Sequence, residues 1–185
     1  MMKICMYGAA SDKIGENYKK CVELLGEEIA KRGHTLVYGA GGTGLMGACA
    51  RGVTKGGGEI IGVAPHFMHE FEDIYSECTK LIETETMAER KEIMETNAEA
   101  FVIVPGGIGT YDEFFQVLTL KQLKRHNKPI VLYSINGYYD YIPSVIGSGI
   151  VKGFISPSVA DMFVICETYQ DVVSQIEELY NKNNS

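Results

Sequence analysis

The sequence predicts a single α/β domain built on a doubly wound parallel sheet, with helices on both faces. Three observations lead to this fold class. Short apolar segments, which lack alternating polar residues, alternate along the chain with longer segments of helical periodicity. This is the pattern of a parallel sheet buried on both faces. Two glycine-rich turns each follow such an apolar segment, at the place where ligands of these sheets bind. The length of 185 residues suits one domain over 1–185, without a repeat or a linker.

The first half of the chain is predicted to hold three strands and two helices. In the first helix Tyr18, Val22, Leu25 and Ile29 recur at helical spacing, and Gly33 supplies its C-terminal stop. The second helix is rich in small residues, which let it lie close to a sheet or a ligand. The predicted order is a strand over 3–8, a helix that ends at 32, a strand over 35–39, a helix to about 54 and a strand over 59–64.

The second half continues this alternation after an irregular segment over 66–77. Strands are predicted over 80–82, 101–104, 129–133 and 162–166, and helices over 86–97, 111–125, 138–146 and 169–180. The polar end of the chain, 181–185, is expected to be frayed.

Composition and charge exclude several classes of protein. The net charge of −7 argues against a nucleic-acid surface, which needs a basic face, and no apolar run approaches membrane-spanning length. A small anion remains compatible with this charge, because backbone N–H groups bind phosphate even in an acidic protein. The five cysteines are scattered, odd in number and without a Cys-x-x-Cys pair, which is typical of reduced thiols. Since no signal peptide opens the chain, we expect a cytoplasmic protein.

The second glycine-rich turn is the centre of the functional argument. Residues 102–113 read VIVPGGIGTYDE, a buried strand that runs through glycines into a helix start. Such a turn exposes N–H groups at the positive end of a helix, so a phosphate is its natural occupant. Glu113 stands one turn further on, within reach of that ligand. Thr110-x-x-Glu113 is also the spacing of a capping box, in which both side chains only satisfy the backbone.

The helix over 86–97 carries a second candidate. Met87, Met94 and Ala98 form an apolar stripe, and Arg90 projects inside this arc rather than on the acidic face. A charge that faces the core needs a partner or a ligand, because its desolvation is costly. The alternative is an arginine that snorkels at the edge or forms a structural pair.

The first glycine-rich turn has the dinucleotide-binding spacing Gly39-x-Gly41-x-x-Gly44. That fingerprint also needs an acidic residue at the end of the following strand, and Glu59 lies at the start of that strand instead. A nicotinamide or flavin cofactor is therefore not expected, and a second backbone cradle is the functional alternative. His66 and His69 lack companions at metal-ligand spacing, so we expect no metal. Nothing resembles the elbow of a serine or cysteine nucleophile.

Three motifs together carry a family resemblance. They are Pro105-Gly106-Gly107-x-Gly109-Thr110-x-x-Glu113, Gly39-x-Gly41-Gly42-x-Gly44-Leu45-Met46-Gly47 and Met87-Ala88-Glu89-Arg90-Lys91. In order and spacing, from residue 3 to about 154, the chain resembles the LOG ("Lonely Guy") proteins, which are cytokinin riboside 5′-monophosphate phosphoribohydrolases. The third motif departs from the family pattern, because Ala88 replaces a histidine. Such proteins often carry the name lysine decarboxylase, for which the sequence offers no reason.

The resemblance implies a Rossmann-like homodimer, without a cofactor, that cleaves the N-glycosidic bond of an adenine-type nucleoside monophosphate. By motif position Arg90 and Glu113 are the implied catalytic pair. The positions implied to lie around the nucleotide are Glu72, Lys91, Gly106, Gly107, Ile108, Gly109, Thr110, Tyr111, Asp112 and Thr119, with Gly41, Gly42 and Gly44 in the first turn.

The expected reaction is hydrolysis of a purine nucleoside 5′-monophosphate to free base and ribose 5-phosphate. Glu113 stabilises the positive charge of an oxocarbenium-like transition state and orients water. Arg90 holds the substrate and keeps Glu113 ionised, because a cation lowers a carboxyl pKa. Two rival functions stay open. A non-catalytic carrier of a phosphorylated ligand needs only the glycine turns, and a pyridoxal-phosphate decarboxylase needs a Schiff-base lysine.

Overall fold

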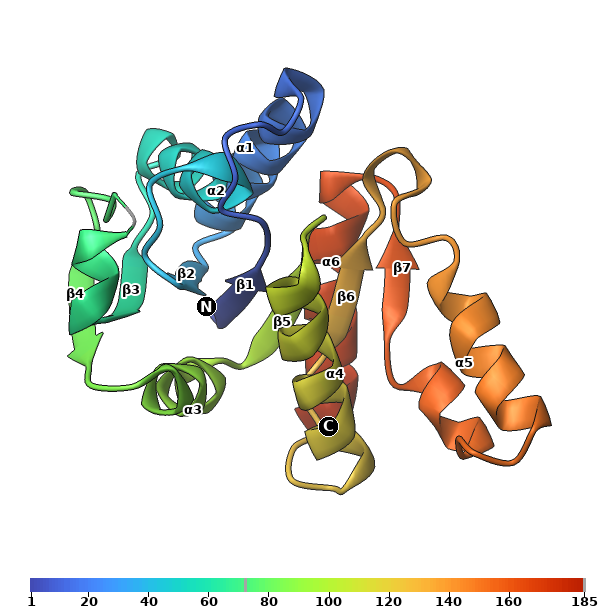
Figure 1. Ribbon diagram of the computed structural model, residues 1–185. Helices are drawn as coiled ribbons and strands as arrows, with labels where there is room; N and C mark the ends of the chain where they lie inside the picture. The colour runs from blue at the N-terminus through green and yellow to red at the C-terminus, as the bar shows by residue number, and fades with distance from the viewer. Residues whose placement is uncertain (72, 185) are drawn as a thin grey trace.

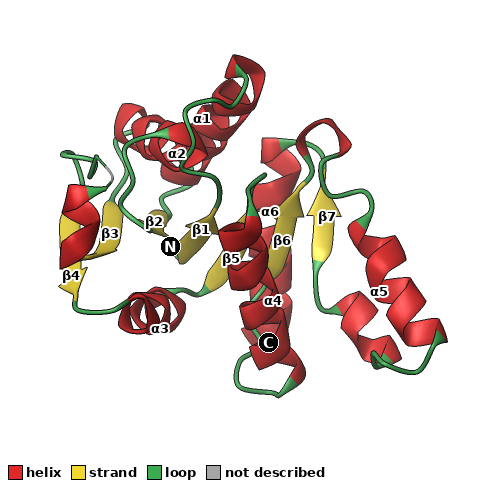
Figure 2. Cartoon of the chain, in the orientation of Figure 1, coloured by secondary structure: helices red, strands yellow, loops and turns green. Residues whose placement is uncertain are grey.

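The computed structural model describes residues 1–71 and 73–184, and in this part of the chain it forms one seven-stranded parallel sheet (Figures 1 and 2). The strand order is β4-β3-β2-β1-β5-β6-β7. The strands are β1 (Lys3–Tyr7), β2 (Thr35–Tyr38), β3 (Ile60–Pro65), β4 (Lys80–Thr84), β5 (Ala100–Ile103), β6 (Ile130–Tyr133) and β7 (Val164–Cys166). The predicted fold class is confirmed, and each predicted strand forms within two residues of its expected bounds.

Helices cover both faces of the sheet, as the apolar strands require. Successive residues of β1 point to opposite faces: Ile4 and Met6 enter one core cluster, whereas Cys5 and Tyr7 enter the other. The first cluster packs under α1 (Glu16–Lys31), α2 (Gly44–Lys55) and α6 (Tyr169–Asn184), and the second under α3 (Met87–Asn97), α4 (Ile108–Gln122) and α5 (Ile142–Val151). Short 3₁₀ turns lie at His66–Glu70, Ile135–Gly137 and Pro157–Asp161.

The order of the strands reverses between β1 and β5, and this reversal positions the site. From β1 the chain runs outward through β2 to β4, and from β5 it runs outward through β6 to β7. The helix after β1 covers one face and the helix after β5 covers the other, so the two connecting loops separate at the carboxyl ends of these strands (Figure 1). A crevice at this switch point is where open α/β sheets bind ligands.

The predicted bounds of three helices are wrong. Helix α4 spans Ile108–Gln122 rather than 111–125, because the chain turns into helical geometry directly after the extended Gly107. Helix α5 spans Ile142–Val151 rather than 138–146, since Asn136 and Gly137 at positive φ first turn the chain. The end of the chain is not frayed over 181–184, because α6 continues to Asn184 and the Asn183 side chain donates to the Asn127 carbonyl. In the described part of the chain, no helix is both long and apolar enough to cross a membrane.

Candidate active site

A pocket of about 360 Å³ opens at the switch point, between the carboxyl ends of the strands and helices α3 and α4. This volume is within the range of small-molecule sites. Its floor comes from the end of β1, and its walls come from the loop after β1, the two glycine turns and three helices. The described residues that line it are Met6, Tyr7, Gly8, Ala9, Ala10, Ser11, Gly39, Met46, Met87, Arg90, Met94, Gly107, Gly109, Thr110 and Glu113.

The N-terminus of α4 borders this pocket. Gly107 is the N-cap, in extended geometry and without a side-chain cap, and the first helical hydrogen bond runs from Tyr111 N to Gly107 O at 3.1 Å. The helix itself therefore supplies no acceptor for the N–H groups of Ile108, Gly109 and Thr110. Because Thr110 lies inside the first turn, Thr110 and Glu113 form no capping box, and the purely structural interpretation of that spacing is wrong.

Close packing explains the glycine that precedes the cap. A Cβ on Gly106 would lie 2.1 Å from the Thr110 Oγ1, so a side chain there would displace the buried threonine. Around Gly107 and Gly109 a Cβ would meet open space. These two positions are exposed to the pocket and to solvent, so a ligand can approach the backbone there.

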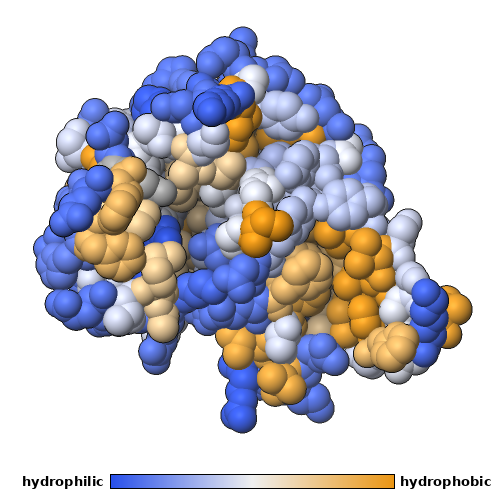
Figure 3. Space-filling model, viewed as in Figure 1, coloured by the Kyte–Doolittle hydropathy of each residue, from blue (hydrophilic) through white to orange (hydrophobic). Residues whose placement is uncertain are grey.

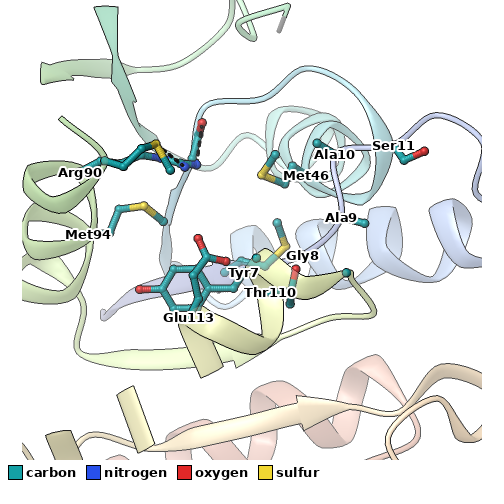
Figure 4. A pocket seen from close by; sticks show the side chains of 15 residues that line it. Tyr7, Gly8, Ala9, Ala10, Ser11, Met46, Arg90, Met94, Thr110 and Glu113 are labelled. Carbon is teal, nitrogen blue, oxygen red and sulfur yellow. Dashed lines mark hydrogen bonds between the residues drawn. The ribbon is translucent and has the colours of Figure 1, made fainter. Parts of the chain in front are cut away.

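Glu113 points into the pocket from the second turn of α4 (Figure 4). Burial raises the pKa of its carboxyl from 4.5 to about 7, although Arg90 and Lys91 act in the opposite direction. The expectation that Arg90 keeps Glu113 ionised is therefore wrong, because desolvation of the carboxylate outweighs the nearby cations. A carboxyl with a pKa near 7 can both accept and donate a proton at neutral pH.

Arg90 enters the pocket from α3, whose first turn is capped by the Thr86 side chain. Arg90 is only 7% exposed, so it does not snorkel. Its Nε donates to the Val63 carbonyl at 3.1 Å, and its Nη2 donates to the Gly39 carbonyl at 3.4 Å. A Cβ on Gly39 would lie 1.7 Å from Nη2, so only glycine leaves room for the guanidinium.

Among the described residues no carboxylate forms a salt bridge with Arg90, and Glu113 acts on its charge only across the pocket. Its third contact, from Nη1 to the Met87 sulfur at 3.8 Å, is also with an uncharged group. A buried cation without an ionic partner is unfavourable unless a ligand supplies the opposite charge. Figure 4 places the Arg90 guanidinium and the Glu113 carboxyl on two sides of one open space.

Lys91 and Asp112, both implied substrate contacts, pair with each other instead of lining the pocket. The Lys91 ammonium contacts the Asp112 carboxylate and donates to Gln116 Oε1 at 3.1 Å. The Gln116 amide in turn contacts Glu95. These links join α3 to α4. Lys91 follows Arg90 in the sequence and Asp112 precedes Glu113, so the links lie next to both residues.

Three other implied contacts of α4 lie off the pocket. Ile108 is 84% exposed, and Thr119 is also exposed. The Tyr111 hydroxyl contacts that of Tyr141, and its ring meets Tyr139 edge-on. Glu72, the remaining position, lies outside the described residues.

The expected second cradle at the first glycine turn does not form, because its N–H groups already have acceptors. Gly44 N donates to the Asp12 carboxylate at 3.0 Å, and Leu45 N donates to the Ala9 carbonyl at 2.9 Å. Gly42 N donates to the Asp73 carbonyl at 2.7 Å, and Gly41 bridges to Ile74. Gly41, Gly42 and Gly44 thus hold the walls of the pocket and do not line it.

Sequence reasoning missed the loop after β1 and the methionines. Residues 8–11 line the pocket, although their composition carries no chemical signal. Met6, Met46, Met87 and Met94 come from three separate elements and converge there. The position of the loop, at the end of the central strand, was the one clue that could have indicated it.

Comparisons with known proteins show which family the chain resembles. A family model described as "Possible lysine decarboxylase" matches residues 46–176. A probable cytokinin riboside 5′-monophosphate phosphoribohydrolase of Oryza sativa subsp. japonica is 34% identical over 95% of this chain and 72% of its own length. A cytokinin riboside 5′-monophosphate phosphoribohydrolase of Arabidopsis thaliana is 34% identical over 95% of this chain and 82% of its own length.

The chain belongs to the LOG family. A solved structure with this LOG fold is the molybdenum cofactor carrier protein of Chlamydomonas reinhardtii, with a TM-score of 0.76. It is 23% identical and covers 96% of this chain and 97% of its own. At that identity the likeness concerns the fold alone.

Proposed function

We propose that this protein hydrolyses the N-glycosidic bond of a purine nucleoside 5′-monophosphate, with adenine or N6-substituted adenine as the base. The products are the free base and ribose 5-phosphate. The observation that carries the proposal is the buried Arg90 cation, without a salt bridge to a described carboxylate, across the pocket from a carboxyl whose pKa is about 7. The LOG relatives named phosphoribohydrolases support this reaction class.

The open N-terminus of α4 holds the 5′-phosphate in this proposal. The N–H groups of Gly109 and Thr110 lack helical acceptors, and the helix dipole adds positive charge at this point. An anion bound there also meets the field of Arg90. Binding energy from the phosphate, which does not react, then aligns the ribose C1′ with Glu113.

Glu113 acts at the reacting carbon. As the C1′–N bond breaks, its electron pair leaves with the base and positive charge develops on the ribose. The ionised carboxylate stabilises that charge and takes a proton from the attacking water as the C1′–O bond forms. The same proton then passes to the departing base. Water is thereby divided between the two products, and no cofactor is required.

The two rival functions make different demands on the pocket. A Schiff base needs a lysine, but no described residue that lines the pocket is a lysine, so pyridoxal phosphate does not fit. A carrier of a phosphorylated ligand does not need a carboxyl group with a pKa near 7 opposite a buried arginine.

The test is incubation of the protein with AMP and related monophosphates, with free base and ribose 5-phosphate followed by chromatography. We expect equal amounts of the two products. Tight binding without release of base would overturn hydrolysis in favour of the carrier.

We also propose that the protein forms a homodimer through the outer face of α4 and α5. Apolar side chains gather there on the surface (Figure 3), and large exposed apolar patches mark interfaces. The exposed large apolar side chains of these two helices and of the residues that flank them are Ile108, Phe115, Leu123, Tyr141, Val145, Val151 and Phe154, here named the α4–α5 face. A second copy is its occupant in this proposal, since one self-complementary face closes a symmetric pair.

A further inference from the structure

The apolar side of the pocket is built from methionines. Met6 comes from β1, Met46 from α2, and Met87 and Met94 from α3. We call these four residues the methionine wall. Met6, Met46 and Met94 are almost fully buried, although all four border the pocket. Figure 4 shows Met46 and Met94 reaching toward the open space from different sides.

Few of the described residues that line the pocket have polar side chains. Among the described lining residues they are Tyr7, Ser11, Arg90, Thr110 and Glu113. Arg90, Thr110 and Glu113 serve the phosphate and the ribose in the proposed function. Ser11 is exposed at the mouth, and the Tyr7 hydroxyl is buried without a hydrogen-bond partner in the described chain.

Covalent geometry assigns the remaining space. In a nucleoside monophosphate the phosphate on C5′ and the base on C1′ extend from opposite ends of the ribose. With the phosphate at the N-terminus of α4 and C1′ at Glu113, the base extends over the methionine wall. Thioethers make favourable contacts with aromatic rings and adjust to rings of different outline.

We infer that the methionine wall contacts the flat face of the base, and that the pocket makes few hydrogen bonds to the edge of the base. The protein therefore accepts several purine nucleoside monophosphates. This inference rests on the proposed function and adds its substrate range. A site that hydrogen-bonds its substrate lowers kcat/KM for analogues that lack the bonding group by factors of about 10⁴–10⁵. In an apolar pocket the kcat/KM values of similar substrates differ by only about 10–200-fold. Flexible methionine-rich surfaces are also those that tolerate varied ligands.

The first experiment compares kcat/KM for AMP, GMP, IMP and N6-benzyl-AMP, together with their affinities for the Glu113→Gln variant by calorimetry. We expect all four to be hydrolysed within about a hundredfold of one another. A wider spread overturns the inference and leaves hydrolysis standing. Comparable binding of all four without release of base overturns the proposed function and leaves the methionine wall standing.

The second experiment tests the wall itself with Met46→Leu, which keeps the apolar volume but removes the sulfur. We expect AMP to bind about 2- to 10-fold more weakly, because one thioether–ring contact is lost. Inhibition by ribose 5-phosphate, which has no base, should not change. An equal loss for both ligands would mean a general distortion of the pocket and would overturn the inference.

Two further variants sharpen this test. Met46→Gln has a similar shape but adds an amide, and it should widen the spread among the four bases by about tenfold or more, because the amide hydrogen-bonds some edges and not others. An unchanged spread would place the base elsewhere. Met162→Leu is the matched control, since Met162 packs against the second core cluster and is not among the residues that line the pocket. Both ligands should bind this variant as they bind the parent.

Discussion

Glu113 shows how strongly the surroundings of one side chain determine its chemistry. Its carboxyl lies in a pocket that excludes enough water to raise the pKa to about 7, beyond the compensating effect of Arg90. Such a shift lowers the stability of the protein at high pH. The folded state binds a proton more tightly than the unfolded state, so this contribution is complete below pH 4.5 and is lost as pH rises through 7.

The Glu113→Gln variant separates these two effects. We expect its turnover of AMP to fall by about a hundredfold or more, because the neutral amide neither stabilises an oxocarbenium ion nor takes a proton. At pH 8 the variant should unfold at a higher temperature than the parent, because a buried charge has been removed. The expected gain in the free energy of unfolding is about 1–3 kcal/mol. Near-normal turnover would rule out a catalytic Glu113.

The pH profile of the parent gives a second measurement on the same residue. If the ionised carboxylate is the active form, kcat rises with pH and its midpoint lies near the pKa of about 7, displaced by the bound phosphate. A kcat that is level from pH 5 to 9 would contradict this role.

Arg90 depends on a glycine 51 residues away. We expect Gly39→Ala to reduce kcat/KM by about tenfold or more, because the new Cβ would lie 1.7 Å from Nη2 and would displace the guanidinium. Gly147→Ala is the matched control, since its Cβ meets nothing within 4 Å and its helix gains propensity. Arg90→Lys should also be severely impaired, because lysine loses the planar fork. Parental kinetics in Gly39→Ala would show that the position of Arg90 is unimportant.

At the scale of elements, the start of α4 carries the binding of phosphate. The helix begins at Ile108, three residues earlier than predicted, so Gly109 and Thr110 become first-turn positions with unpaired N–H groups. Helix α2 begins in a similar way, but Asp12 and Ala9 of the chain occupy its N–H groups. Of these two helix starts, that of α4 is the one that keeps free N–H groups at the pocket.

The discrimination between AMP, adenosine and ATP tests this terminus. Each hydrogen bond to a charged phosphate is worth about 1.5–3 kcal/mol. Two such bonds predict a kcat/KM for AMP about a hundredfold or more above that for adenosine. ATP should also be disfavoured, because a pocket of about 360 Å³ has little room for a longer chain of phosphates. Equal turnover of adenosine and AMP would show that the start of α4 does not bind the phosphate.

At the scale of the whole molecule, the α4–α5 face is a group of exposed apolar side chains that the pocket does not explain. Leu123 is 62% exposed and Phe154 is 85% exposed, on the side of the sheet that carries α3, α4 and α5. A protein that leaves such side chains in water as a monomer risks uncontrolled association. A defined partner surface on a second copy resolves this risk.

Sedimentation tests the proposed dimer. We expect the parent to sediment as a dimer, and Leu123→Glu or Phe154→Glu to shift it toward monomer, because a buried unpaired carboxylate is costly at an interface. Lys20→Glu on the exposed surface of α1 is the charge control and should leave the assembly unchanged. A parent that sediments as a monomer at all concentrations would refute the proposal.

The sequence by itself determined the features that depend on local order. The apolar segments located each described strand, because most of the strands are buried on both faces, and the glycine turns marked the edge of the sheet where the pocket lies. The placement of Arg90 on an apolar arc and of Glu113 beyond the turn was also visible, since both follow from spacing within one helix.

Only the tertiary structure decided what those side chains meet. Four features of the site depend on segments that are far apart in the sequence. They are the raised pKa of Glu113, the ion pair between Lys91 and Asp112, the hydrogen bond from Gly44 N to the Asp12 carboxylate, and the methionine wall. Periodicity within one segment carries no information about such contacts, because they depend on how the helices pack across the sheet. Desolvation, which sets the chemistry of the pocket, arises only from that packing.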